Sequence, residues 1–351
     1  MGAALSFRKH ATTLVIFSGP TDLPDYSERS QLYHRNLNAF LSLGITPHHP
    51  RVTTAVVLTR LLSHLAPSIV ARGARVFYRR NVCYDMESVR VVLDAMRLQA
   101  LQFDYYVMVN CGMFGPALPA YLTVTPSVHW AELVTQAINA TVKLVGMVVC
   151  CGGGGNRRWP HLDSSMWATD AQGLSFIETD GCIYRCGQTT EGLAPTRIAN
   201  EIILLYEMGM SRAITRRGYN LGALNLLQRG VDWRQPANAE GCFRATRTCY
   251  YNDYTYGPPD LMFTKLSAVE FDARASTYGV LGPMYNATWR ASREFSQRYG
   301  FSPALAGDPA TAEKTNPGRQ QAWPRDSRTK QISAPLATPR SAEPKRVNEQ
   351  R

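Results

Sequence analysis

The chain of 351 residues has a formal net charge of +11, and 45% of its residues are hydrophobic while 19% are charged. This composition is typical of a globular protein and excludes collagen-like, coiled-coil and wholly disordered chains. No window approaches the roughly 20 apolar residues of a membrane-spanning helix, and no signal-peptide pattern occurs near the N-terminus. The sequence as written therefore predicts a cytoplasmic protein.

The excess positive charge would suit a phosphate-bearing ligand or an anionic membrane surface. The basic residues are spread along the chain without a recognition-helix, zinc-finger or RNA-binding signature, so sequence-specific nucleic-acid binding is not expected. The eight cysteines contain no C-x-x-C pair, which argues against a structural zinc site. Several cysteines lie in apolar runs, and the eight form no evident disulfide framework, which is the usage of a reducing compartment.

Short apolar runs alternate with helical patterns in the first half of the chain. Helices are predicted at residues 32–43 and 89–96, where apolar side chains recur at spacings of three and four. Continuous apolar runs predict strands at residues 13–18, 53–59, 75–78, 105–109 and 142–149. Strands without polar alternation, separated by helices, predict an α/β fold with a doubly wound, mostly parallel sheet flanked by helices.

The chain divides by composition into three segments. Residues 1–11 form an N-terminal arm, and residues 12–301 form one large domain without an internal repeat. Residues 302–351 are rich in proline and basic residues with few large apolar side chains. Such a segment cannot bury enough apolar surface to offset the entropy of ordering it, so it is predicted to be disordered.

Ligands of doubly wound sheets bind outside the carboxyl ends of the strands. This rule selects the four loops at residues 18–22, 80–88, 110–116 and 150–163. Nucleotide-binding candidates in these loops are Ser18, Asn81, Asp85, Asn110 and Gly112. Asp85 lies where a helix is expected to begin, so it could cap that helix, contact a nucleotide, or do both.

The last of these loops contains four consecutive glycines followed by Arg157 and Arg158. The two arginines could close over a phosphate, or the segment could be a solvated insertion. His161, Asp163 and Ser164 follow as closely spaced polar residues. A lone histidine in such a place is more often a satisfied hydrogen-bonding residue than a catalyst.

Glu207 precedes a helical pattern that ends at Gly218. An acidic residue at the start of a helix can simply complement the helix dipole. The spacing of Glu207 to Gly218 and Tyr219 also favours a second hypothesis, in which the carboxylate of Glu207 acts as a general base.

Together these residues resemble a glycosyltransferase of the GT-A fold. In that superfamily an acidic pair precedes a helix running to Gly-Tyr, and Glu207 matches the second acid, the usual base of inverting members. Four motifs are similar to those of hexosyltransferase-like proteins that are distantly related to rhamnan-synthesis-type polysaccharide glycosyltransferases. They are Asn81-Val-Cys-Tyr-Asp85, Asp104-Tyr-Tyr-Val-Met-Val-Asn110, Pro160-His161-Leu-Asp-Ser-Ser-Met-Trp-Ala-Thr-Asp170 and Tyr206-Glu-Met-Gly-Met-Ser211. The stretch from Pro258 to Lys265 is also similar to a core motif of that group.

One departure from the superfamily concerns its metal. The Asp-x-Asp motif that holds Mn²⁺ or Mg²⁺ against the diphosphate is replaced by Asn110-Cys111-Gly112, which contains no carboxylate. Hard divalent cations prefer charged oxygen ligands, so no metal-binding residue is assigned and a divalent cation is in doubt. Positive charge, including that of Arg157 and Arg158, could neutralise the leaving diphosphate instead.

The resemblance implies transfer of a hexose from a nucleotide-sugar donor to a hydroxyl of a glycan, lipid or protein acceptor. It also implies that His161, Asp163 and Ser164 are candidates for contacts with the acceptor or donor sugar. The alternative is a nucleotide-sugar- or sugar-binding protein that has lost catalysis. The first six residues fit an N-myristoylation pattern at Gly2, so peripheral membrane association, for example at the Golgi or endoplasmic reticulum, is a further possibility. Asn139-Ala-Thr and Asn286-Ala-Thr are N-glycosylation sequons, which matter only in the secretory pathway.

Overall fold

The computed structural model describes residues 11–23, 28–116, 128–151, 159–183, 202–225, 228–238 and 262–265. All of them belong to the first of two units, Met1–Ala306 and Gly307–Arg351. The predicted boundary at residue 302, Gly2 and Asn286 lie outside the described residues. Among the residues described, no helix combines the length and the apolar character needed to cross a bilayer.

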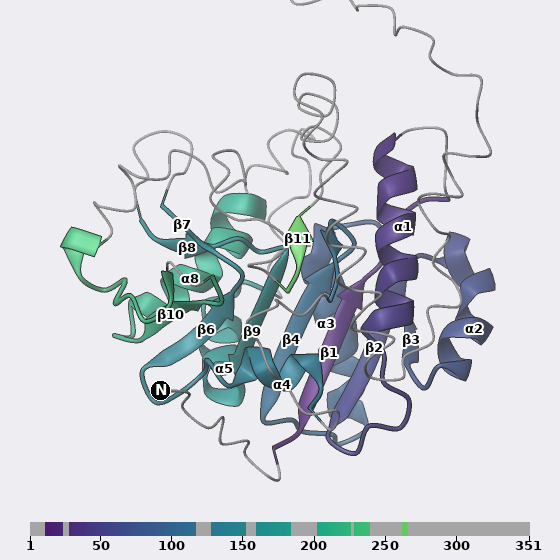
Figure 1. Ribbon diagram of the computed structural model, residues 1–351, viewed down its shortest axis with the longest axis horizontal. Coiled ribbons are helices and arrows are strands. Elements are labelled where there is room, and N and C mark those ends of the chain that lie inside the picture. Colours follow the sequence, from purple (N-terminus) through teal and green to yellow (C-terminus); the bar gives the residue numbers. More distant parts are fainter. Residues whose placement is uncertain are drawn as a thin grey trace, which may run out of the picture. The chain divides into compact units, whose positions relative to one another are not determined.

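A seven-stranded sheet forms the centre of the described region (Figure 1). Its strand order is β10-β6-β9-β4-β1-β2-β3. Strand β9 runs antiparallel to its neighbours β4 and β6, and the other four pairings are parallel. The predicted α/β fold class, a doubly wound and mostly parallel sheet flanked by helices, is confirmed. The strands are β1 (Thr13–Ser18), β2 (Val52–Leu58), β3 (Arg75–Tyr78), β4 (Tyr105–Asn110), β6 (Val142–Gly146), β9 (Met166–Asp170) and β10 (Asn220–Ala223).

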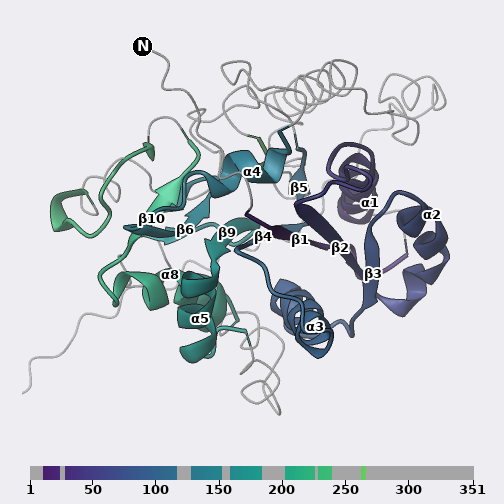
Figure 2. The same cartoon turned by 90° about the horizontal axis from the view of Figure 1, so that it is seen from below.

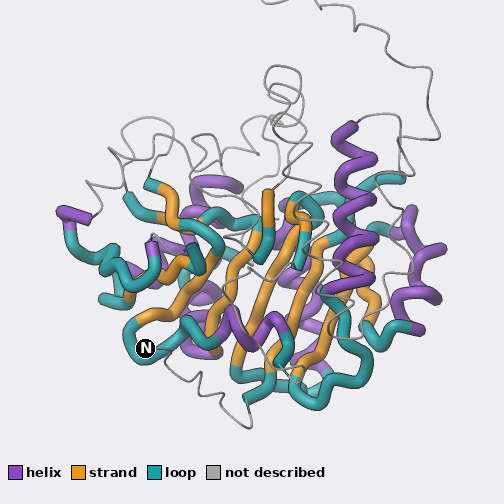
Figure 3. The backbone as a smooth tube through the Cα atoms, in the orientation of Figure 1, coloured by secondary structure: helices purple, strands orange, loops and turns teal. Residues whose placement is uncertain are grey.

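Helices cover both faces of this sheet, with α1 and α4 on one face and α3, α5 and α8 on the other (Figure 2). Short helix α2 follows the 3-10 helix η1 beside β3, and the π-helical turn η2 leads directly into α8. Figure 3 shows the same arrangement as a backbone tube. The helices are α1 (Glu28–Leu43), η1 (Arg60–Leu65), α2 (Ala66–Ala71), α3 (Tyr84–Leu98), α4 (Trp130–Thr135), α5 (Ala171–Thr179), η2 (Ile202–Glu207) and α8 (Met208–Thr215).

Strand β1 shows why the sequence has apolar runs rather than alternation. Val15 and Phe17 pack on the α1 face, while Leu14 and Ile16 pack on the α3 face. Because side chains of a strand alternate between faces, a strand covered on both sides must be apolar at every position. Phe17 stacks on Phe40 of α1 with ring centroids 4.1 Å apart, which fixes that helix against the sheet.

The run at residues 142–149, predicted as one strand, is divided in the structure. Strand β6 ends at Gly146, and β7 (Val149–Cys150) pairs antiparallel with β8 (His161–Leu162) in a separate small sheet. The buried carboxamide of Gln228 accepts from the amide of Val149 and donates to its carbonyl, each at 2.8 Å. The chain is therefore held outside the main sheet after Gly146 by a side chain far away in sequence.

The expectation that the cysteines form no disulfide framework is wrong for two residues. Cys83, just before α3, and Cys151, just after β7, are both disulfide-bonded. Disulfides persist in oxidising compartments and are rare in the cytosol. Cysteine spacing alone does not reveal which thiols pair, since pairing depends on contacts between distant segments.

Candidate functional site

Three segments meet at the carboxyl ends of β1 and β4. Ser18 and Asn110, the last residues of these neighbouring strands, lie opposite each other in the sheet. The backbone amide of Asn110 donates to the carbonyl oxygen of Ser165 at 2.9 Å. Because β9 is antiparallel, the turn at residues 163–165 that precedes it lies at the same edge. We call this group of residues the carboxyl-edge cluster; its polar members are Ser18, Asp85, Ser88, Asn110, Asp163, Ser164 and Ser165.

Asn110 and Asp85, two of the candidates in the loops that the sequence selected, are in direct contact. The Asn110 amide nitrogen Nδ2 donates to Asp85 Oδ2 at 2.7 Å, and Asn110 Oδ1 accepts from the amide of Gly112 at 2.9 Å. Both polar atoms of the carboxamide are therefore held in one orientation, and the side chains of Asn110 and Asp85 are half-buried. The contact joins the end of β4 to the first turn of α3.

Asp85 does not cap α3. The residue before the helix is Cys83, whose φ of 56° is in the left-handed region, and no side chain caps the first amides. Asp85 instead directs its carboxylate to Asn110, and an acid in the first turn also complements the helix dipole. Asn81 lies exposed in the loop before α3, and the structure gives it no side-chain contact with the cluster.

Ser18 has a positioning contact with α3. Its hydroxyl lies 2.8 Å from that of Ser88, and both residues have 0% exposure. The two hydroxyls satisfy each other inside the core, which holds the helix against the end of β1. The hydroxyl of Ser18 is therefore enclosed between strand and helix.

Arg79 is a residue that the sequence analysis missed. It directly follows β3, its amide donates to the carbonyl of Leu58 at 2.9 Å, and it is only 7% exposed. Among the described residues its Nε has no hydrogen-bond partner, and the one side-chain hydrogen bond found there joins Nη1 to the carbonyl of Arg80 at 3.3 Å. Within the described ranges no carboxylate forms an ion pair with it. A buried cation without a counter-charge is costly, so the position suits a bound anion; its place directly after a strand was the available signal.

The turn before β9 contains Asp163, Ser164 and Ser165. Asp163 Oδ1 accepts from the amide of Ser165 at 2.8 Å, which shapes the turn that contacts Asn110. His161 is buried within β8, with Nδ1 3.0 Å from the carbonyl oxygen of Trp159. The structure therefore brings Asp163 and Ser164 to the cluster, while His161 is a buried hydrogen-bonding residue of the small sheet.

The beginning of α8 is attached to the same small sheet. The amide of Leu162 in β8 donates to Ser211 Oγ of α8 at 2.9 Å. The dipole interpretation assumed that Glu207 lies at the start of a helix. Glu207 is instead the last residue of η2, so its backbone lies inside the continuous helical segment formed by η2 and α8. The side chain of Glu207, and both Arg157 and Arg158, lie outside the described part of the chain. Gly218 has a φ of 80° and ends the helical segment, as predicted.

The segment that follows β4 is paired with a distant part of the chain. Strand β5 (Met113–Phe114) pairs antiparallel with β11 (Thr264–Lys265). Residues 262–265 close the stretch from Pro258 to Lys265 singled out in the sequence, and Met262 and Phe263 are buried in the core on the α1 face. Residues 262–265 therefore hold the segment that follows Asn110 against the core.

The cluster does not fit a divalent cation held in the manner of Asp-x-Asp. Among the described residues, no group of three or more His, Cys, Asp or Glu side chains could hold a metal ion. At the end of β4, Asn110 presents an amide donor to Asp85, the opposite of what a cation requires from its ligands. No step is therefore assigned to Mn²⁺ or Mg²⁺.

Comparison with known proteins found similarity of fold alone. No family model matches the chain, and no curated protein matches it. A nucleoside-diphosphate-sugar pyrophosphorylase from Vibrio cholerae RC9 is similar with 10% identity and a TM-score of 0.35, over 66% of this chain and 100% of that one. A glycosyltransferase involved in glycosylation of the major capsid of PBCV-1 has 10% identity and a TM-score of 0.33, over 76% and 100%. Glucosyl-3-phosphoglycerate synthase from Mycobacterium tuberculosis, in complex with Mn²⁺, UDP and phosphoglyceric acid, has 13% identity and a TM-score of 0.28, over 47% and 57%. Similarities of this size do not assign an activity to this chain.

Proposed function

We propose that the protein is a glycosyltransferase that moves a hexose from a nucleotide-sugar donor to a hydroxyl of a glycan, lipid or protein. The observation that supports this most is the carboxyl-edge cluster, in which Asp85, Asn110 and the Asp163 turn lie together. Ligands of doubly wound sheets bind at this edge. A nucleotide-sugar carries hydroxyls for such oxygen-rich side chains and a diphosphate for cations.

The leaving diphosphate needs positive charge when the bond to the sugar breaks. Arg79 supplies a buried guanidinium at the same edge without a carboxylate partner among the described residues. Fixed cations in a site from which water is excluded stabilise developing negative charge without a metal. Arg157 and Arg158 are further candidates for this role.

Glu207 is the proposed base. An alcohol is a poor nucleophile until a positioned group takes its proton as the new bond forms. In an inverting reaction the carboxylate of Glu207 would remove the acceptor proton while the hydroxyl oxygen attacks the anomeric carbon, and the nucleoside diphosphate would leave with the bonding electron pair. The attachment of α8 to β8 brings this part of the chain next to the segment that ends in the Asp163 turn.

The test uses calorimetric titration of the full chain with a panel of UDP- and GDP-sugars, with and without Mn²⁺, followed by a turnover assay with the donor that binds. R79Q should weaken donor binding by about 10- to 150-fold, the value of a charge-assisted hydrogen bond of ~1.5–3 kcal/mol. The neighbouring exposed arginine provides the matched control R80Q, which should bind normally.

Turnover separates the enzyme from the alternative, a catalytically degenerate binder. E207Q should lower turnover by ~10²–10⁴-fold, the usual share of a general base, and leave donor binding intact. The control E178Q makes the same chemical change in an ion pair with Arg97 and should leave turnover unchanged. Donor binding without turnover by the unmodified chain would refute the transferase, and normal turnover by E207Q would transfer the proposed role to Asp163.

A further inference from the structure

The turn between α4 and β6 presents the sequence Asn139-Ala140-Thr141 on the surface. All three residues are exposed. The backbone amide of Asn139 donates to the carbonyl of Val142 at 3.0 Å, which closes the turn. The amide of Asn220 in the edge strand β10 donates to the carbonyl of Thr141 at 2.7 Å, so the turn is anchored to the sheet.

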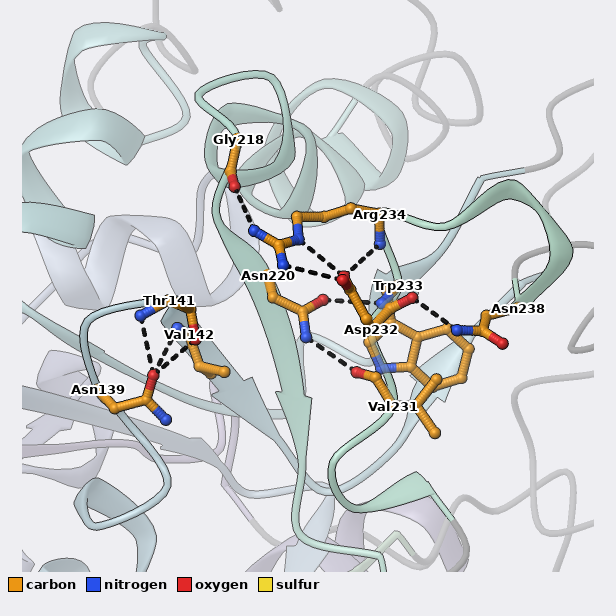
Figure 4. Close-up of polar contacts among 10 residues, drawn as sticks. All are labelled: Asn139, Thr141, Val142, Gly218, Asn220, Val231, Asp232, Trp233, Arg234 and Asn238. Carbon is orange, nitrogen blue, oxygen red and sulfur yellow. Dashed lines mark hydrogen bonds and ion pairs between the residues drawn. The ribbon is translucent and has the colours of Figure 1, made fainter.

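Both functional groups of the Asn139 side chain have a defined position. Its Oδ1 accepts from the amide and the hydroxyl of Thr141, each at 2.9 Å, and from the amide of Val142 at 3.0 Å. Its Nδ2 has no hydrogen bond in the described region and points away from these contacts (Figure 4). The carbonyl is fully used within the turn, and the nitrogen is left accessible from solvent.

A second and independent observation concerns the compartment. Cys83 and Cys151 are disulfide-bonded. Disulfides form and persist in the lumen of the endoplasmic reticulum and outside the cell, and Asn-x-Thr sequons are glycosylated in the same pathway. The oxidised cysteines therefore indicate the environment in which an accessible Asn-x-Thr nitrogen is modified.

We propose that Asn139 carries an N-linked oligosaccharide. In the modification, Asn139 Nδ2 forms a bond to the anomeric carbon of an oligosaccharide carried by a polyprenyl diphosphate. The bond between that carbon and the diphosphate breaks, the polyprenyl diphosphate leaves with the electron pair, and one Nδ2 proton is released. The carbonyl oxygen is not altered, so its three hydrogen bonds remain.

The glycan would lie away from the carboxyl-edge cluster. Strands β6 and β4 are both antiparallel to β9, so their amino ends share one edge of the sheet. Asn139 lies in the turn just before β6 at this amino edge, whereas Asn110 ends β4 at the opposite edge. The proposal is therefore independent of the function proposed for the cluster, and loss of the glycan should not change donor binding.

The experiment follows the full chain directed to the endoplasmic reticulum of cultured eukaryotic cells. The N286Q background removes the second sequon, so a mass shift on treatment with peptide N-glycosidase reports Asn139 alone. Release in ¹⁸O-labelled water marks the formerly glycosylated asparagine, and mass spectrometry of the peptides should find the label at Asn139. N139Q should abolish the shift.

Two substitutions of Thr141 distinguish the sequon from a folding effect. T141S keeps the hydroxyl and should remain glycosylated, whereas T141V keeps the shape and should lose the glycan. Peptide mapping without reduction should find Cys83 and Cys151 in disulfides in the same sample. An unlabelled Asn139 beside a labelled secretory reporter protein would overturn the proposal, as would persistence of the mass shift in T141V.

Discussion

Replacement of Asn110 by aspartate tests the geometry of the carboxyl-edge cluster directly. In the native chain, Asn110 Nδ2 donates to Asp85 Oδ2 at 2.7 Å. N110D replaces that donor with a carboxylate oxygen while keeping an acceptor for the amide of Gly112. Two carboxylates would then face each other where one hydrogen bond existed.

The size of the effect follows from this distance. A lost hydrogen bond to a charged group costs about 1.5–3 kcal/mol. Coulomb repulsion between unit charges about 3 Å apart is roughly 5 kcal/mol at an effective dielectric constant of 20, but both side chains are half-buried and can move apart. We expect N110D to lower the free energy of unfolding by about 2–4 kcal/mol near neutral pH.

The deficit should depend on pH with a definite sign. Repulsion raises the pKa of one carboxyl of the N110D pair above its unfolded value. The unfolded variant therefore loses this proton at lower pH than the folded one, so stability is lost as pH rises through the raised pKa. Urea unfolding at about pH 5 and pH 7.5 should show a larger difference from the native chain at the higher value.

The double substitution D85N/N110D is the control, because it returns one amide donor and one carboxylate acceptor with their positions exchanged. It should recover most of the stability lost in N110D, which makes the two effects strongly non-additive. N110D as stable as the native chain near neutral pH, or additive effects in the double variant, would refute the contact between Asn110 and Asp85.

Two further predictions concern stability away from the cluster. Burial first, and then the nearby His49 ring, lower the pKa of His129 to about 3, so the free energy of unfolding should fall by up to ~1.4 kcal/mol per pH unit as pH drops below ~6.5. H129N keeps a cap for the amide of Ala131 and should flatten this slope in urea unfolding. An unchanged slope would contradict the assignment to His129. Asp170 Oδ2 accepts from the ammonium of Lys143 at 2.7 Å, and both side chains are largely buried. D170A should therefore cost about 3–5 kcal/mol in the same assay. D170N should cost less because it keeps the helix cap, and a D170N variant as stable as the native chain would show that the ion pair is unimportant.

The sequence predicted the parts of the fold that local patterns specify. Strands β1, β2 and β4 are short apolar runs that are largely buried on both faces, and β3 is a half-buried edge strand. The positions of all four agree with the prediction to within one residue at either end. The contact of Asp85 with Asn110 was also predictable, because parallel strands bring their carboxyl ends to one edge. In both cases the information lies in a few adjacent residues.

Other features depend on contacts between distant segments. The short apolar run Met166–Ala168 does not indicate whether β9 pairs parallel or antiparallel with its neighbours. The break after Gly146 depends on Gln228, about eighty residues further along the chain. That Arg79 is buried without a carboxylate partner among the described residues appears only when its neighbours in space are known. Sequence patterns could locate the site but not its electrostatics.

Because β9 is antiparallel to its neighbours, its two ends serve different purposes, one at the proposed ligand site and one in the stability of the fold. At its start, the Asp163 turn contributes to the wall of the proposed ligand site. At its end, which lies at the opposite edge of the sheet, Asp170 binds Lys143 and caps α5. A library randomised before Met166 should therefore vary in what it binds while remaining folded, whereas one randomised at Asp170 should vary in whether it folds at all.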